Sequence, residues 1–207
     1  MRLIKFIAIS LGLVASLTSQ AGGMSKDIQR LRDLLQPITS LSANFEQQIN
    51  DANGIEIQAS TGLFQIAQPN NLRWNITQPM PQQVISNGIT VWLYDPDLEQ
   101  VIVQPFNANI EFAPAMLFAG DLKNVDSMYF IVESSEGVFD LTPEQTGSLF
   151  SAVQITFDGP LPTGMVMTDS LGQVTRISLS EVVYNPALAA ELFVFDIPED
   201  IDVIRND

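Results

Sequence analysis

The stretch VWLYDPDLEQVIV, residues 91–103, holds the pattern on which the fold depends. Its two apolar runs flank Asp95-Pro96-Asp97, and Asp and Pro favour tight turns, so the stretch predicts a β-hairpin. Successive side chains of a strand point to opposite faces. Trp92 and Tyr94 therefore lie on one face, and the aliphatic residues beside them lie on the other. Both faces of the hairpin are apolar, which raises the question of what each one contacts.

Further strands are predicted by short apolar alternations, which turns rich in Gly, Asp, Ser and Pro separate. Asn87-Gly88 is a typical two-residue hairpin turn. In the segment 55–68 the apolar positions change parity at Thr61-Gly62, which predicts a β-bulge there. Besides the hairpin, the expected strands lie at 42–49, 55–68, 72–77, 82–86, 128–134, 138–142, 152–158, 173–180 and 192–198. Strands without long helices between them favour a mainly β protein with one antiparallel, strongly curved or barrel-like sheet.

Two segments predict helices instead. SKDIQRLRDLLQP, residues 25–37, has Ser25 as a capping residue, an apolar stripe at helical spacing, and Pro37 at its end. The segment 109–124 is a compact apolar run around Pro114 without strand alternation. We expect one or two short helices in it, inserted between strands, which would plug the mouth of a curled sheet.

The first residues have the parts of a secretory signal peptide. Arg2 and Lys5 give a short basic region, an apolar region spans 6–17, and small residues lead up to Ala21. We expect cleavage after Ala21, which leaves residues 22–207 as a single domain. The alternative is an uncleaved amphipathic anchor.

Charge and cysteine content narrow the class of protein. Without Arg2 and Lys5 the chain has 9 − 2 = 7 basic residues against 24 acidic ones, a net charge of 7 − 24 = −17. Such acidity argues against nucleic acids and against anionic membrane surfaces as partners, although solubility alone explains much of it. The chain has no cysteine. It therefore has no disulfide and no site for the lipid that bacterial lipoproteins carry on a cysteine.

Histidine is also absent, which removes Ser-His-Asp and Cys-His catalysis and the ordinary zinc and haem sites. The remaining catalytic option is a pair of carboxylates of the glycosidase kind. The candidate acids lie in predicted turns, where solvated carboxylates are ordinary: Asp95, Asp97, Glu133, Glu136, Asp158 and Asp169. Asp95-Pro96-Asp97 begins like a calcium loop but lacks its glycine and closing glutamate. We expect no catalytic residue, no metal and no cofactor.

The order of motifs resembles the LolA family of outer-membrane lipoprotein carrier proteins. A helix is followed by ANFEQQ (43–48), TGLFQIAQPNNLRWNITQP (61–79) and VISNGITVWLYDPDLEQV (84–101). The residues that match the family pattern are Phe45, Gln47, Gly62, Phe64, Pro69, Leu72, Trp74, Gly88, Trp92, Tyr94, Asp95, Pro96, Glu99 and Gln100. The resemblance extends from residue 25 to about residue 200. In the C-terminal half it follows the order of elements more than the residues.

The resemblance implies an incomplete, strongly curved antiparallel β-barrel with short helices as a lid over a hydrophobic cavity. It implies a periplasmic chaperone, not an enzyme, that takes acylated lipoproteins from an inner-membrane ABC transporter and delivers them to an outer-membrane receptor. That receptor is itself a lipoprotein, so the missing cysteine favours the soluble carrier. We expect a monomer without stable membrane insertion and without nucleic acid.

The residues expected to line or cover the cavity are Phe45, Phe64, Leu72, Trp74, Trp92, Met116, Leu117 and Phe118; ordinary core packing is the alternative for each. One face of the Trp92 hairpin is expected to pack on the helix at 25–36 or on 109–120, and the other to line or back the cavity. Many family members have an arginine before the turn proline that bonds to the lid. Here that position is Gln68, whose uncharged amide predicts a weaker latch.

Three other functions stay open from the sequence. One is a periplasmic lipid-sensing regulatory protein of the same fold, which normally has a second domain. Another is a carboxylate-dependent enzyme that acts on envelope glycans. The third is a structural β protein without an apolar ligand.

Overall fold

The computed structural model describes residues 25–106, 118, 128–144 and 148–206. In these residues the predicted N-terminal helix is confirmed as α1 (Lys26–Leu35). The hydroxyl of Ser25 accepts a hydrogen bond from the backbone N–H of Ile28 at 3.2 Å, as an N-cap residue does. The helices expected at 109–124 lie outside the described residues, apart from the position of Phe118.

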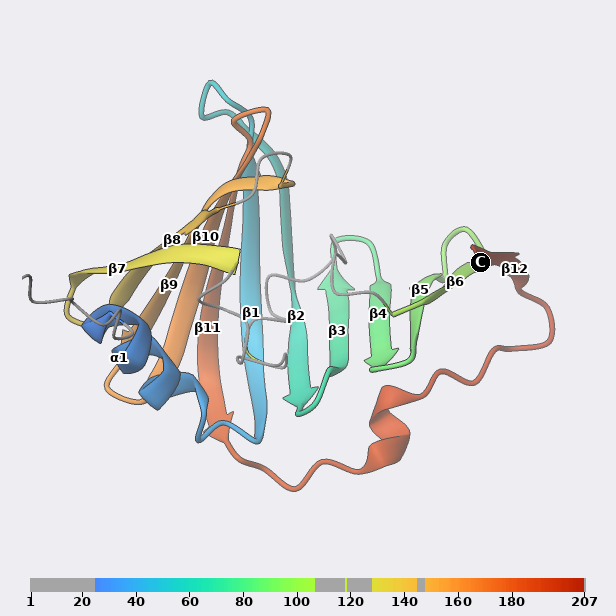
Figure 1. Ribbon diagram of the computed structural model, residues 1–207. Coiled ribbons are helices and arrows are strands. Elements are labelled where there is room, and N and C mark those ends of the chain that lie inside the picture. Colours follow the sequence, from blue (N-terminus) through green and yellow to red (C-terminus); the bar gives the residue numbers. More distant parts are fainter. Residues whose placement is uncertain (1–24, 107–117, 119–127, 145–147, 207) are drawn as a thin grey trace, which may run out of the picture.

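Within the described part of the chain, twelve strands form one sheet, and Figure 1 shows that this sheet is open and curved. In chain order the strands are β1 (Ser40–Asn50), β2 (Glu56–Ala67), β3 (Asn71–Gln78), β4 (Gln82–Asn87), β5 (Thr90–Asp95), β6 (Gln100–Pro105), β7 (Tyr129–Ser135), β8 (Val138–Pro143), β9 (Phe150–Asp158), β10 (Leu161–Asp169), β11 (Val174–Tyr184) and β12 (Asp202–Arg205). Across the sheet their order is β12-β6-β5-β4-β3-β2-β1-β11-β10-β9-β8-β7. All neighbours are antiparallel except β12 and β6. The predicted mainly β fold with one curved sheet is confirmed.

Side chains that accept backbone hydrogen bonds build the predicted turns. In the β5–β6 turn, a carboxylate oxygen of Asp95 accepts from the N–H groups of Asp97 and Leu98, each at 3.1 Å. In the β4–β5 turn, the amide oxygen of Asn87 accepts from the N–H of Thr90 at 2.8 Å. Gly88, which follows Asn87, has a positive φ of 79°, a backbone conformation that glycine adopts readily. Both predicted hairpins are therefore confirmed.

The register of β2 on β3 shifts between Thr61 and Gly62, the place where the β-bulge was predicted. The additional residue, however, is Thr77 of β3, and β2 pairs regularly with β1 at this point. A Cβ on Gly62 would lie 2.0 Å from the carbonyl oxygen of Asn75, so only glycine fits this close approach. The apolar residues before the shift do not join the core. Ile55 and Ile57 are 62% and 58% exposed.

Two parts of the C-terminal half differ from expectation. Strand β10 was not predicted, since Pro162 and Gly164 interrupt its apolar pattern. The strand predicted at 192–198 is wrong: the 3-10 helix η2 (Ala190–Phe193) is followed there by chain without regular structure. Its alternation is real, because Phe193 is buried while Val194 is 47% exposed. The segment, however, lies against β3 and β4 instead of extending the sheet at an edge, so no hydrogen-bond ladder forms.

The two faces of the sheet carry separate apolar clusters. The inner face, defined by Phe45, Phe64 and Trp74, forms the main core together with α1. The outer face carries a smaller cluster of Ile85, Trp92 and Val101, which the C-terminal segment covers. Among the described residues, no helix is both long and apolar enough to cross a membrane.

Candidate functional site

A row of aromatic rings crosses the inner face of the sheet. The ring of Phe45 on β1 stacks on Trp74 of β3, with 3.9 Å between ring centroids and 28° between planes. The ring centroid of Trp74 lies 5.6 Å from that of Phe64 on β2. On the far arm of the sheet, Phe157 of β9 meets Phe139 of β8 edge to face at 5.9 Å. The edge-to-face pair of Phe157 and Phe139 has a favoured geometry for buried rings.

Phe118 joins the two arms. Its ring centroid lies 6.4 Å from that of Phe64 and also 6.4 Å from that of Phe157. Strands β2 and β9 are four positions apart in the sheet order, which is about 19 Å in a flat sheet. The two rings are at most 6.4 + 6.4 = 12.8 Å apart. Curvature of the sheet therefore brings the arms together around Phe118.

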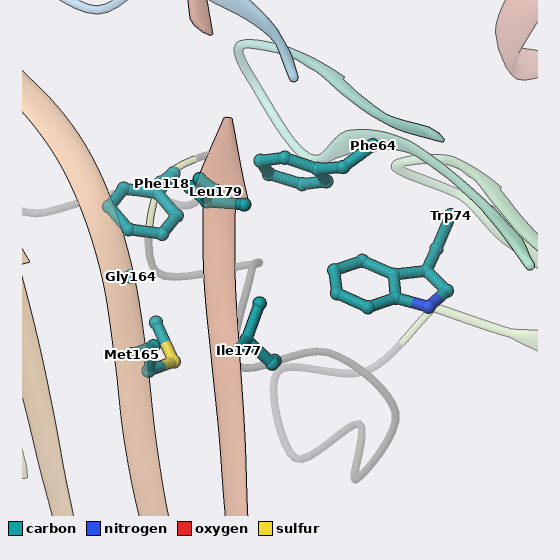
Figure 2. A pocket seen from close by; sticks show the side chains of 7 residues that line it. All are labelled: Phe64, Trp74, Phe118, Gly164, Met165, Ile177 and Leu179. Carbon is teal, nitrogen blue, oxygen red and sulfur yellow. The ribbon is translucent and has the colours of Figure 1, made fainter. Parts of the chain in front are cut away.

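A small enclosed space of about 10 Å³ remains between these rings and β10–β11. Its described lining is wholly apolar: Phe64, Trp74, Phe118, Gly164, Met165, Ile177 and Leu179. In Figure 2, Leu179 lies between the rings of Phe64 and Phe118, and the Trp74 indole points toward Ile177. A space of this volume holds about one water molecule. This space is therefore too small for a ligand in the described part of the structure.

The structure brings together five of the residues predicted from the sequence. The described residues of that set that share the inner core, each at most 6% exposed, are Phe45, Phe64, Leu72, Trp74 and Phe118. Three of them line the enclosed space, and Phe45 stacks on Trp74. Met116 and Leu117 lie outside the described residues.

Trp92 does not join this group. Trp74 pairs across the strands with Val84, and Ile85 pairs with Trp92, so Trp74 and Trp92 are on opposite faces. Trp92 belongs to the outer cluster, where the neighbouring Tyr94 meets Phe195 at 4.9 Å between centroids. One face of this hairpin was expected to pack on the N-terminal helix or on 109–120, and the other to line or back the cavity. The Trp92 face does neither in the described part of the chain, because it packs on the C-terminal segment.

Arg73 holds the C-terminal segment to the same outer face. Its guanidinium donates to the backbone carbonyl of Leu192 at 3.1 Å and to the side-chain oxygen of Gln83 at 2.9 Å. The contact fixes η2 over β3 and β4, next to the outer apolar cluster. A sequence reading finds no partner for Arg73, because Leu192 is 119 residues away.

Gln68 lies at the end of β2, where its backbone N–H donates to the carbonyl of Thr39 at 2.9 Å. Its side chain is half-buried. Among the described residues no side-chain hydrogen bond of Gln68 is present. The backbone, not the amide, therefore anchors this position here.

Several residues of the site were missed by the sequence analysis. Met165 of β10 and Ile177 and Leu179 of β11 line the enclosed space. The apolar alternation of Ile177 and Leu179 was available in the sequence, whereas Met165 lies in the strand that was not predicted. Half-buried Tyr129 packs against the same core, and burial raises the pKa of its hydroxyl.

Three of the acidic residues considered as catalytic candidates accept backbone hydrogen bonds within turns. Carboxylate oxygens of Asp95 and Asp169 accept backbone N–H groups within their own turns. Glu133 does the same for the N–H of Gly137 at 3.0 Å. In the described ranges, no group of three or more acidic side chains could hold a metal ion.

Comparison with known proteins agrees with this apolar site. A sequence model of the family described as "Outer membrane lipoprotein carrier protein LolA" matches residues 36–196. Similar proteins include the outer-membrane lipoprotein carrier protein of Chromohalobacter salexigens, 38% identical over 203 residues and 96% of each chain. Another is the outer-membrane lipoprotein carrier protein of Pseudomonas aeruginosa, 36% identical over 210 residues and 100% of each chain.

Solved structures extend the likeness to the fold. The chain resembles a LolA superfamily protein from Nitrosomonas europaea with a TM-score of 0.51 at 15% identity, over 83% of this chain and 99% of that one. It also resembles an uncharacterised conserved protein from Thermus thermophilus, with a TM-score of 0.52 at 16% identity over 86% and 98% of the two chains. At such identities the likeness concerns the fold alone.

Proposed function

This chain belongs to the LolA family of outer-membrane lipoprotein carrier proteins, and from that premise we propose that its interior receives the acyl chains of lipoproteins. The observation that carries the proposal is the wholly apolar space around Phe64, Trp74 and Phe118. Burial of each methylene group is worth about 0.8 kcal/mol. An interior of this chemistry suits acyl chains and offers nothing to a polar substrate.

Loading requires the interior to open. The space of about 10 Å³ is far below the roughly 300–1,000 Å³ of typical ligand pockets. Phe118 touches both arms of the sheet. Its withdrawal would therefore open a space between Phe64 and Phe157. We assign Phe118 as the side chain that acyl chains displace, with Phe45, Phe64, Leu72 and Trp74 as the walls that remain.

The remaining predicted positions are assigned as follows. Trp92 belongs to the outer cluster, away from the acyl chains. Met116 and Leu117 stay predictions. Gln68 keeps the latch role that the family resemblance gives to its position, and the lack of a side-chain hydrogen bond in the described part supports a weak latch.

The energetics of transfer call for an energy-consuming donor. A three-chain anchor with about 45 methylene groups resists extraction into water by roughly 35 kcal/mol. A carrier cannot supply this free energy by binding alone, so an ATP-driven transporter in the inner membrane would extract the lipoprotein. The carrier would then cross the periplasm, to which the N-terminal signal peptide directs it, and release its cargo to an outer-membrane receptor.

The test uses energised spheroplasts, from which lipoprotein release into the supernatant is measured with purified protein added. Release that depends on this protein, and is lost when ATP is depleted, supports the carrier function. Failure to release lipoproteins, while a related carrier works in the same preparation, contradicts it. The regulatory alternative is not favoured, since carrier proteins match this chain over its full length.

A further inference from the structure

The upper part of β2 has a free edge. Pairing of β2 with β3 begins at Thr61, which lies opposite Gln78, and Pro79 follows directly. Beyond that point Glu56–Ser60 pairs only with β1 among the described residues. Figure 1 shows β1 and β2 extending past the end of β3. A free strand edge presents backbone N–H and C=O groups that a further strand can pair.

A groove of about 750 Å³ lies along this edge. Among the described residues, three glutamines and three hydroxyl-bearing residues line it, together with Glu46, Glu56 and Arg176. Arg176 makes a long contact of 3.4 Å to the side-chain oxygen of Asn50, and Glu56 accepts from the Gln48 amide at 2.5 Å. The lining is thus rich in hydrogen-bonding groups, unlike the wholly apolar interior.

Ser60 is an independent observation that points to a polar ligand at this edge. It lines the groove, its side chain is only 4% exposed, and its hydroxyl oxygen has no hydrogen-bond partner among the described residues. Leaving a buried polar group unpaired costs about 1–3 kcal/mol, so native proteins rarely keep one without a use.

The free edge starts where the apolar interior ends. Most of the groove, including Glu46, Gln48 and Arg176, lies on the outer face beside this edge, because these residues alternate with the inward positions. On the inner face of the β1–β2 pair, Phe45 lies opposite Gly62, and the next inward pair is Gln47 opposite Ser60. Phe45 stacks on Trp74 of the acyl-chain site, while Gln47 and Ser60 line the groove. Two residues along a strand correspond to about 7 Å. A ligand with an apolar end and a polar continuation can therefore extend from the interior, past Gln47 and Ser60, to the free edge of β2.

We propose that the groove binds the extended polypeptide next to the acylated end of the cargo, and that this polypeptide adds as a strand to the free edge of Glu56–Ser60. Acyl chains in the interior leave the attached polypeptide at its rim, where this edge begins. Strand addition recognises the main chain. It therefore suits a carrier whose cargoes differ in sequence.

This inference rests on the proposed function, and its test separates the two. The first probe is a cysteine amide with acyl chains and no further residues. The second is the same acylated cysteine followed by about eight Ser and Asn residues, an ordinary strand length. Two more probes carry N-methyl groups on alternate residues of the extension, in the two possible phases, so that each lacks the N–H donors of one strand edge.

Binding of the protein without its expected signal peptide, residues 22–207, to each probe is measured by fluorescence anisotropy. We expect the extension to tighten binding about tenfold, and one N-methylated phase to lose this gain. Hydrogen exchange at residues 56–60 should slow with the extended probe and not with the acylated cysteine amide. Equal affinities for the first two probes, or unchanged exchange at 56–60, would overturn the inference while leaving the carrier function intact.

Two further outcomes decide between the proposed function and the assignment of the edge to cargo. If the acylated cysteine amide itself does not bind, the proposed function fails, whatever the groove does. If exchange at 56–60 slows with protein concentration in the absence of a probe, the edge pairs with a second copy of the chain, which contradicts the cargo assignment. Ser60→Ala should reduce the gain from the extension, whereas Ser42→Ala, on β1 outside the groove, should preserve it.

Discussion

The ring of Phe118 lies 6.4 Å from that of Phe64, and the same ring contacts Phe157 on the opposite arm of the sheet. Among the described residues, Phe118 is thus the side chain that bridges the two arms. About 10 Å³ of space is left beside it. Where acyl chains enter this interior, as proposed, the free energy of cargo binding must cover the loss of these ring contacts.

Phe118→Ala should lower stability and ease loading. Removal of a buried phenylalanine side chain costs about 3–5 kcal/mol in unfolding free energy, because transfer energy is lost and a cavity is created. The same cavity admits apolar ligands, so association of an acylated cysteine amide should be faster than for the unmodified protein. Denaturant unfolding and stopped-flow fluorescence measure the two effects.

The matched control is Phe193→Ala. Phe193 is equally buried, at 2% exposure, but belongs to η2 on the outer face. It should lose comparable stability without a change in association rate. Faster loading in both variants would mean that general loosening, and not the position of Phe118, governs entry.

Gly62→Ala should destabilise the protein by more than an exposed glycine change. A Cβ at this position would lie 2.0 Å from the Asn75 carbonyl oxygen and 2.8 Å from the Phe45 ring. Backbone cannot yield as a flexible side chain does, so we expect a loss of at least about 1–3 kcal/mol, as for overpacked cores. Gly159→Ala is the comparison, because its added Cβ would meet nothing within 4 Å. Gly159 has a positive φ of 56°, so the stability lost in that variant measures backbone strain alone. The difference between the two variants in thermal unfolding measures the steric clash at Gly62.

Gly62 also shows what the sequence predicts well. Local rules place a register shift at Thr61-Gly62, a turn at Asn87-Gly88 and a helix at 25–37, since turn and cap residues act within a few positions of themselves. They do not show that the additional residue at the shift belongs to β3. Phe45, Phe64, Leu72, Trp74 and Phe118 were identified as one set through the family resemblance together with strand alternation.

Contacts between distant segments were not predictable in this way. The Trp92 face has the same alternation as a cavity wall, and only the path of the C-terminal segment decides that it lies outside. Residues 192–198 alternate like a strand because one side faces an apolar surface, yet backbone pairing needs a free sheet edge. Periodicity in the sequence indicates that one side of a segment is buried, but it does not indicate which part of the chain covers that side.

Arg73→Met should release the C-terminal segment. Hydrogen bonds to a charged donor contribute about 1.5–3 kcal/mol, and the lower end applies to the part-buried pairs with Leu192 and Gln83. Amides of η2 should exchange faster, while binding of acylated cysteine amide stays unchanged. Arg205→Met, at an exposed position of β12, is the matched control; equal effects of the two variants on η2 would point to net charge instead of the Leu192 contact.

Asp51→Asn should change how stability depends on pH. The carboxylate of Asp51 accepts from the N–H groups of Ile55 and Asn53, each at 2.9 Å, and these hydrogen bonds, that of Ile55 first, lower its pKa below 3.8. A lowered pKa in the folded state means that the ionised form stabilises the fold. This contribution is complete above the unfolded pKa and is lost as pH falls through the folded pKa.

The melting temperatures of the unmodified protein and of Asp51→Asn should therefore differ by a constant amount above about pH 5 and converge below about pH 4. Asp97→Asn, in the β5–β6 turn, tests whether any surface carboxylate gives the same convergence, because no hydrogen bond to the Asp97 side chain is seen in the described part of the chain. A difference between Asp51→Asn and the unmodified protein that persists undiminished into acid would show that the β1–β2 turn depends on the shape of residue 51 and not on its charge. That turn leads directly into Glu56–Ser60, so its integrity also sets the position of the free edge of β2.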